Sequence, residues 1–124
     1  MAIEQWSENI WLIQLDNEPA LSEDLIQLKD KVRRADETPF LVIYFGSVTH
    51  INSSNLSQLL RVRKEVVARD GKIKITGLSD SIWAVFLTTA LDKIFDFAAD
   101  LPTALAGLQI GELSIDFKGS SDES

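Results

Sequence analysis

The chain has 124 residues, of which 45% are hydrophobic, a composition typical of one compact folded domain and unlike that of a disordered chain. It contains no cysteine and a single histidine, which excludes disulfides, thiolate metal sites and multi-histidine metal sites, and no cofactor is predicted. The formal net charge of -7 makes a general nucleic-acid-binding surface unexpected and favours a protein partner.

The sequence does not predict a membrane-bound or secreted protein. No apolar run approaches the ~18 residues of a membrane span, and residues 1–5 have no basic region ahead of an apolar one. We therefore expect a cytoplasmic protein without membrane insertion.

Two short apolar stretches, residues 3–7 and 10–15, are separated by a polar pair and predict a β-hairpin. The second stretch has apolar side chains pointing both ways, which indicates a central strand. Trp6 and Trp11 are predicted to pack in the core or against the hairpin, with a binding role as the alternative.

A helix is predicted after the turn at residues 16–19, because Pro19 suits a helix start. Its apolar residues share one helical face: Leu21, Leu25, Leu28 and Val32. Basic residues between positions 29 and 34 load its carboxyl half, where they complement the helix dipole. Such a charge run predicts a solvated face, and a binding patch is the alternative.

Residues 40–45 (FLVIYF) are apolar or aromatic without alternation, which predicts a strand covered on both faces, as in a parallel sheet. Gly46 ends it, and residues 52–55 (NSSN) then supply side chains that accept hydrogen bonds from the free N–H groups of a helix start. Ser53 and Ser54 are therefore expected where a strand tip meets a helix N-terminus, a position that favours negative charge or phosphate.

The helix after Ser54 is predicted to bury one broad apolar arc. Its members are Leu56, Leu59, Leu60, Val66 and Val67, with Val62 at the edge. Residues 70–71 (DG) close the helix, because glycine permits a left-handed cap. The alternating residues 72–76 (KIKIT) then predict a strand near a sheet edge, with its lysines facing outward.

Another helix is predicted after the cap at residues 79–80. Its buried face comprises Ile82, Val85, Phe86 and Thr89. Trp83 falls off that stripe, and two interpretations stay open: partial burial against a neighbour, or an exposed aromatic contact for a partner.

The last predicted elements are a short strand within residues 94–97 and a helix over residues 101–108, and the domain is expected to span residues 1–108. Residues 109–117 form a C-terminal extension with four apolar side chains, which cover an exposed sheet edge or meet another copy of the chain in a homodimer. Residues 118–124 are rich in serine and aspartate and are predicted to be disordered.

Residues 48–56 (VTHINSSNL) resemble the V-x-x-I-D-S-S-G-L signature of STAS domains, the anti-sigma-factor antagonist family. Residues 78–95 resemble a second family segment, L-S-x-x-V-x-x-V-L-x-x-T-G-L-D-x-x-F. The two blocks have the family's spacing, and the resemblance covers residues 3–108. It implies a single α/β domain, with a mixed sheet of four to five strands and about four helices packed on it.

The resemblance also implies a regulator of bacterial transcription and not an enzyme. In the family, the first serine of the motif, Ser53 here, is phosphorylated by a serine kinase that is also the anti-sigma factor. The unphosphorylated form binds that kinase and frees the sigma factor, and the phosphate blocks binding. Asn52 stands where the motif has Asp, and Asn55 where it has Gly. The residues expected to bind the partner are Val48, His50, Asn52, Ser53, Ser54, Asn55, Ser57 and Trp83.

Catalytic chemistry is not indicated by the residues themselves. The serines have no Gly-x-Ser-x-Gly elbow, His50 precedes Ser53 by three residues, and nothing marks an oriented base or an oxyanion hole. The sequence shows neither a glycine-rich phosphate loop nor a carboxylate cluster with metal-ligand spacing.

Three alternatives to a phosphorylation switch stay open. Ser53 and Ser54 could serve only as helix caps. The domain could be a non-phosphorylated STAS subunit of a larger assembly, such as a lipid-transport complex or a signalling scaffold. It could also bind a small ligand or nucleotide in a crevice near residues 46–54.

Overall fold

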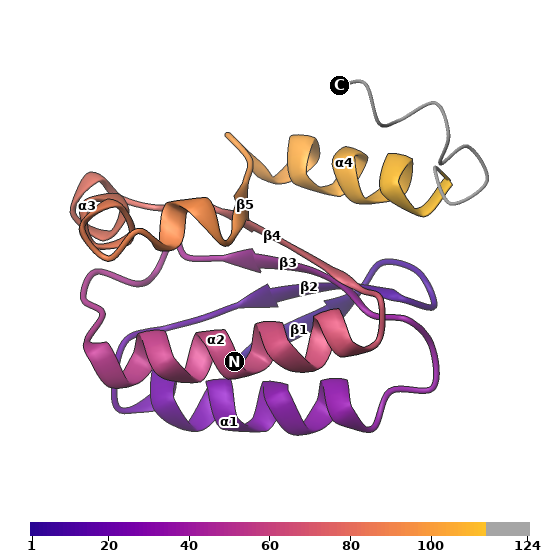
Figure 1. The fold of residues 1–124 in the computed structure, drawn as a ribbon, viewed down its shortest axis with the longest axis horizontal. Helices are drawn as coiled ribbons and strands as arrows, with labels where there is room; N and C mark the ends of the chain where they lie inside the picture. The colour runs from indigo at the N-terminus through magenta and orange to yellow at the C-terminus, as the bar shows by residue number, and fades with distance from the viewer. Residues whose placement is uncertain (114–124) are drawn as a thin grey trace.

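The computed structural model describes the backbone of residues 1–113 and the side chains of residues 1–108 (Figure 1). The elements in chain order are β1 (Ala2–Gln5), β2 (Ile10–Gln14), α1 (Ala20–Arg33), β3 (Phe40–Tyr44), α2 (Ser53–Ala68), β4 (Lys72–Thr76), α3 (Asp80–Thr88), the 3-10 turn η1 (Leu91–Lys93), β5 (Asp96–Phe97) and α4 (Leu101–Leu113). The end of the predicted C-terminal extension and the whole predicted tail, residues 114–124, lie outside the described residues.

All five strands form one mixed sheet in the order β1-β2-β3-β4-β5. β1 and β2 are antiparallel, which confirms the predicted hairpin, and the other neighbours are parallel. The parallel register aligns Ile13, Ile43 and Ile75 in one row across the sheet. The predicted mixed α/β fold is confirmed, with α4 continuing to Leu113, beyond the predicted helix end.

Helices cover both faces of this sheet (Figure 1). α1 and α2 lie side by side on one face, and all four predicted core residues of α1 are buried there. α4 lies on the other face, where Leu105 and Leu108 pack in one cluster with Val42 of β3. β3 is therefore covered on both faces, as its unbroken apolar sequence predicts.

The buried face of α2 is rotated from the predicted arc. Val62 is fully buried instead of lying at the edge, whereas Val67 is 49% exposed, so its predicted burial was wrong. The cause is the helical angle of about 100° per residue. The stripe through Leu59, Val62 and Val66 faces the sheet and α1, which turns Val67 outward.

Two other residues predicted to be buried are exposed. Trp6 is 50% exposed, because β1 ends at Gln5 and no strand carries the next side chain toward the core. Thr89 is exposed as the C-cap of α3, where its hydroxyl donates a hydrogen bond to the Val85 carbonyl oxygen at 2.8 Å. Trp11 in β2 is partly buried against the core, as predicted.

The turn that ends α2 differs from the predicted one in which residue is left-handed. Asp70 takes that conformation, with φ 62, and Gly71 does not. Gly71 is required for another reason, because a Cβ atom there would collide with the backbone carbonyl oxygen of Pro39. The turn between α2 and β4 therefore packs closely on the start of β3.

This packing predicts opposite effects for two glycine substitutions. Gly71→Ala should lower the free energy of unfolding by about 1–3 kcal/mol, because the new methyl group overpacks rigid backbone. Gly107→Ala in α4 is the matched control, since the nearest atom to its new methyl group is Lys74 Cε at 3.5 Å. It should raise the free energy of unfolding by about 0.5–1 kcal/mol. Urea unfolding at neutral pH measures both, and equal effects would contradict the prediction.

Candidate functional site

Two loops that follow parallel strands meet at the carboxyl end of the sheet. Residues 15–19 join β2 to α1, and residues 45–52 join β3 to α2. Val48 anchors the second loop, since its side chain is 1% exposed and its N–H donates to the Phe45 carbonyl oxygen at 2.9 Å. The loop then leads into Ser53, the first residue of α2.

Asn52 is the N-cap of α2, with an extended backbone at φ -116 and ψ 175. Its side-chain oxygen accepts a hydrogen bond from the Asn55 N–H at 2.8 Å, and Asn55 Oδ1 accepts one from the Asn52 N–H at 3.0 Å. This reciprocal pair is a capping box made from two asparagines. The interpretation of Ser53 and Ser54 as the helix caps was therefore wrong, because Asn52 performs that role.

The side chain of Asn55 is fully buried, at 0% exposure, and all of its polar groups are used. Besides the bond that its oxygen accepts, its Nδ2 group donates to Glu18 Oε2 at 2.8 Å and to Ser22 Oγ at 3.2 Å. Glu18 lies in the loop before α1, and Ser22 lies in its first turn. The residue that stands at the motif's glycine position therefore fastens the start of α2 to the start of α1.

Glu18 is the negative centre of this network. Its carboxylate accepts hydrogen bonds from the Ser22 hydroxyl, from the Asn55 amide, and from the Ser22 N–H at 2.9 Å. The Ser22 hydroxyl, followed by the Asn55 amide and the Ser22 N–H, holds the pKa of Glu18 below its ordinary value of 4.5. Glu18 is therefore expected to remain charged next to the start of α2 at neutral pH.

Asn17 holds the other side of the same loop. Its Oδ1 accepts hydrogen bonds from the N–H groups of Thr49 at 2.9 Å and of His50 at 3.3 Å, and its Nδ2 donates to Thr49 Oγ1 at 3.0 Å. The His50 ring is exposed, and its Nδ1 atom lies 2.9 Å from the hydroxyl of Thr49. Within the described part of the chain, no hydrogen bond joins His50 to Ser53, so the two do not form a nucleophile–base pair here.

A shallow hollow of 330 Å³ lies beside the start of α2. It is lined by Asn17, Glu18, His50, Ile51, Asn52 and Asn55. Five of these six residues are polar, and both loops contribute. The hollow is in the region where the sequence predicts a crevice, and its volume is at the lower end of the range of small-molecule sites, about 300–1,000 Å³.

The structure brings most of the predicted partner-binding residues to one end of the sheet, in different roles. His50, Asn52, Ser53, Ser54 and Ser57 are exposed, whereas Val48 and Asn55 are buried and position the loop. Figure 1 places α3, which carries Trp83, at the same end of the sheet as the start of α2. The surface residues of this end can meet a partner directly, and the buried ones fix their geometry.

Trp83 combines the two interpretations that the sequence left open. Its side chain is 36% exposed, and its ring packs edge-on against Phe97 with the ring centroids 5.0 Å apart. One part of the indole is thus fixed by a neighbour while the rest faces solvent, the arrangement of a rigid aromatic contact.

The sequence pattern does not single out Glu18, Ser22 or Asn17 as residues of the site. One signal could have found them. Asn55 stands where the motif has glycine, and if its side chain is buried, its polar groups need hydrogen-bond partners from an adjacent loop. The loop before α1 offers polar side chains at the required end of the sheet.

Comparison with known proteins agrees with this architecture. The STAS domain profile matches residues 9–104, and the chain therefore belongs to the STAS domain family, as residues 48–56 and 78–95 predict. STAS domains are regulatory domains. Among curated proteins, none matches this sequence.

Solved structures of related regulators share the fold. An anti-sigma-factor antagonist (STAS) domain protein from Planctomyces limnophilus is 15% identical, with a TM-score of 0.75 over 86% of this chain and 97% of that one. The Bacillus cell fate determinant SpoIIAA in its phosphorylated form is 17% identical, with a TM-score of 0.62 over 80% and 91%. A chain of the stressosome, a signal integration and transduction hub, is 16% identical, with a TM-score of 0.64 over 87% and 96%. At these identities the likeness establishes the fold.

Two further features bear on the class of site. Within residues 1–108, no group of three or more His, Asp or Glu side chains is placed to hold a metal ion. No described helix is long and apolar enough to cross a membrane.

The buried network predicts a stability cost for truncating Asn55. Asn55→Ala should lower the free energy of unfolding by about 1–3 kcal/mol, because Glu18 and the Asn52 N–H lose a buried partner. Ser54→Ala is the matched control in the same turn, and its exposed side chain should change stability by less than about 0.5 kcal/mol. Urea unfolding at pH 7 distinguishes them, and two equally stable variants would show that the network does not stabilise the fold.

The lowered pKa of Glu18 predicts a pH dependence with a definite sign. A carboxylate whose pKa falls on folding stabilises the protein above its unfolded pKa of about 4.5, and this contribution disappears as pH falls through the lower folded pKa. The stability difference between the wild type and Glu18→Gln should therefore be constant near neutrality and shrink below pH 4.5. Urea midpoints of both proteins between pH 7 and pH 3 test this, and a difference that does not change with pH would contradict it.

Proposed function

We propose that this chain is an anti-sigma-factor antagonist-like regulator, which binds a serine kinase that is also the anti-sigma factor and is switched by phosphorylation of Ser53. One observation carries the proposal. Ser53 is exposed at the first position of α2, while Asn52 caps the helix, so the Ser53 hydroxyl is not committed to the fold. On this proposal the protein acts in the bacterial cytoplasm and has no catalytic role of its own.

The local electrostatics favour a phosphate on Ser53. A phosphoserine adds a charge of about -1.5 to -2, and a helix N-terminus stabilises negative charge. The first turn of α2 contains no acidic residue of its own. The nearby Glu18 carboxylate keeps its own negative charge, which three hydrogen bonds stabilise. The fold is therefore expected to tolerate the modification.

The same charge is unfavourable in an interface. A partner that covers Ser53 must remove water from the phosphate, which costs several kcal/mol unless a cation meets it. We expect the direct contacts to come from the exposed His50, Asn52, Ser53, Ser54 and Ser57, with Trp83 as an aromatic contact at the rim. Val48 and Asn55 contribute by holding the loop in place. Phosphorylation then changes the interface and leaves the fold intact.

The similarity to solved regulators supports this proposal without deciding it. SpoIIAA has been described in a phosphorylated form, and its chain shares this fold. The second candidate is a STAS subunit that is never phosphorylated and belongs to a fixed assembly. The stressosome chain shares the fold as well, and Asn52 and Asn55 replace the motif's Asp and Gly, which favours that candidate. Phosphate on Ser53 in cells distinguishes the two.

Substitutions at Ser53 test the switch directly. Ser53→Asp should change the free energy of unfolding by less than about 0.5 kcal/mol, because an acidic residue suits the first turn of a helix. It should also fail to bind the partner that a Ser53→Ala bait captures, since the carboxylate must be desolvated in the interface. Ser53→Ala should bind the partner with or without ATP.

Ser54→Ala is the matched control, because it removes the neighbouring hydroxyl and leaves Ser53 available. It should stay sensitive to ATP, and intact mass should show a phosphate on the wild type and on Ser54→Ala only. Pull-downs of the captured partner with and without ATP provide the comparison. Equal binding by Ser53→Asp and Ser53→Ala, with no phosphate on the wild type, would leave the fixed-subunit function as the better account.

A further inference from the structure

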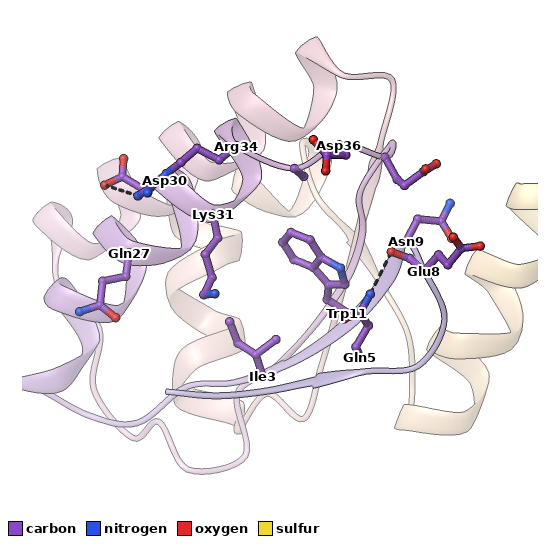
Figure 2. Close-up of a pocket in the computed structure, with 12 residues that line it drawn as sticks. Ile3, Gln5, Glu8, Asn9, Trp11, Gln27, Asp30, Lys31, Arg34 and Asp36 are labelled. Carbon is purple, nitrogen blue, oxygen red and sulfur yellow. Dashed lines mark hydrogen bonds and ion pairs between the residues drawn. The ribbon is translucent and has the colours of Figure 1, made fainter.

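A larger hollow, of 770 Å³, lies away from the Ser53 site (Figure 2). It is a groove between the β1–β2 hairpin and the carboxyl half of α1, and it continues along the loop that leads into β3. Its chemistry comes from Glu8, Trp11, Lys31, Arg34, Asp36 and Glu37. None of the residues that line it is buried, so it is an open groove and not an enclosed cavity.

The groove and the Ser53 site lie at opposite ends of the sheet. β2, β3 and β4 run parallel, so the loops that precede these strands gather at one end and the loops that follow them gather at the other. The groove includes residues just before β3, whereas Ser53 follows the loop after β3. A molecule in the groove therefore does not compete for the surface around Ser53.

Trp11 supplies the recognition surface of the groove. Figure 2 shows its indole in the middle, with Lys31 on the α1 side and Glu8 on the side of the hairpin turn. The indole is partly buried against the core, and no other aromatic ring of the described chain stacks on it. An open indole face on a rigid strand attracts a cation more strongly than any other aromatic side chain.

The charges around Trp11 select for a cation. Arg34 Nη2 lies 3.9 Å from Asp30 Oδ2, so the charges of these two side chains offset each other at the rim of the groove. Glu8, Asp36 and Glu37 are exposed and join no ion pair within the described residues, and Lys31 is the remaining cation of the lining. The chain as a whole carries a net charge of -7, which strengthens the attraction of a basic partner over distance.

We propose that this groove docks a basic, extended segment of a second protein, with an arginine or lysine side chain over the Trp11 indole and beside Glu8, Asp36 and Glu37. An open groove leaves a small ligand largely solvated, whereas small-molecule sites enclose most of their ligand. β1 is the edge of the sheet and pairs only with β2 in the described chain, so its free edge can add an extended segment. Alternate side chains of that segment then point to the face of the sheet on which Ile3 and Gln5 of β1 line the groove.

The docked segment makes the domain an adaptor with two faces. The basic segment stays bound at the groove, while the surface around Ser53 takes up or releases its own partner. This inference does not depend on phosphorylation of Ser53, and Ser53→Asp should bind a basic peptide as well as the wild type does.

The test uses a blocked decapeptide of alternating arginine and threonine, titrated into the full chain by calorimetry. The groove variant is Glu8→Gln, Asp36→Asn and Glu37→Gln together. The control is Asp16→Asn, Glu23→Gln and Asp96→Asn together, three exposed carboxylates outside the groove lining. Both variants remove three negative charges, so any general attraction falls equally. We expect the groove variant to raise the Kd of the peptide at least about tenfold, and the control variant to raise it less than about threefold.

Further measurements identify which chemical groups of the peptide and of the groove are responsible for binding. Trp11→Leu should raise the Kd of the peptide by about three- to tenfold, with little change in the thermal midpoint of the protein. A citrulline version of the peptide, which keeps the shape and loses the charge, should not bind detectably. Equal weakening by the two triple variants, binding of the citrulline peptide, or displacement of the peptide by an equimolar amount of spermine would each overturn the proposal.

Discussion

The buried carboxamide of Asn55 is the contact on which the geometry of the Ser53 site depends. Its oxygen and nitrogen reach Asn52, Glu18 and Ser22, so one side chain joins the cap of α2 to the first turn of α1. A buried amide is costly unless its groups are paired, and these partners satisfy it from three directions. The position of Ser53 is therefore fixed by groups beneath it, and its own hydroxyl is left free for other chemistry.

This arrangement separates the residues that hold the site from those that can change. Asn17, Val48 and Asn55 set the path of the loop, through hydrogen bonds or burial, while the serines stand in solvent. A charge added at the surface then acts on whatever docks there, because the supporting bonds do not involve it. The sheet extends the same separation, since its parallel strands place the Ser53 surface and the Trp11 groove at opposite ends of a packed core.

Departures from the predicted packing have local physical causes. Val67 lies outside because the α2 stripe follows the contact with α1 and the sheet, and this rotation depends on the partner surface. Trp6 is exposed because β1 is only four residues long and ends before it. Gly71 is needed for close approach to Pro39, and Asp70 takes the left-handed turn instead, a choice that the two-residue sequence does not reveal. Each of these outcomes depends on which backbone lies opposite.

The sequence by itself determined the order of strands and helices, the burial of β3 on both faces, the helix start at residues 52–55 and the membership of the family. These follow from periodicity, turn residues and a local motif, all of which are short-range properties. Only the tertiary structure decided that Asn55 reaches Glu18 across 37 positions of the chain, and that Trp11 lines a groove with carboxylates from a separate loop. Those pairings depend on how distant segments meet, and a pattern of neighbours along the chain cannot specify such contacts.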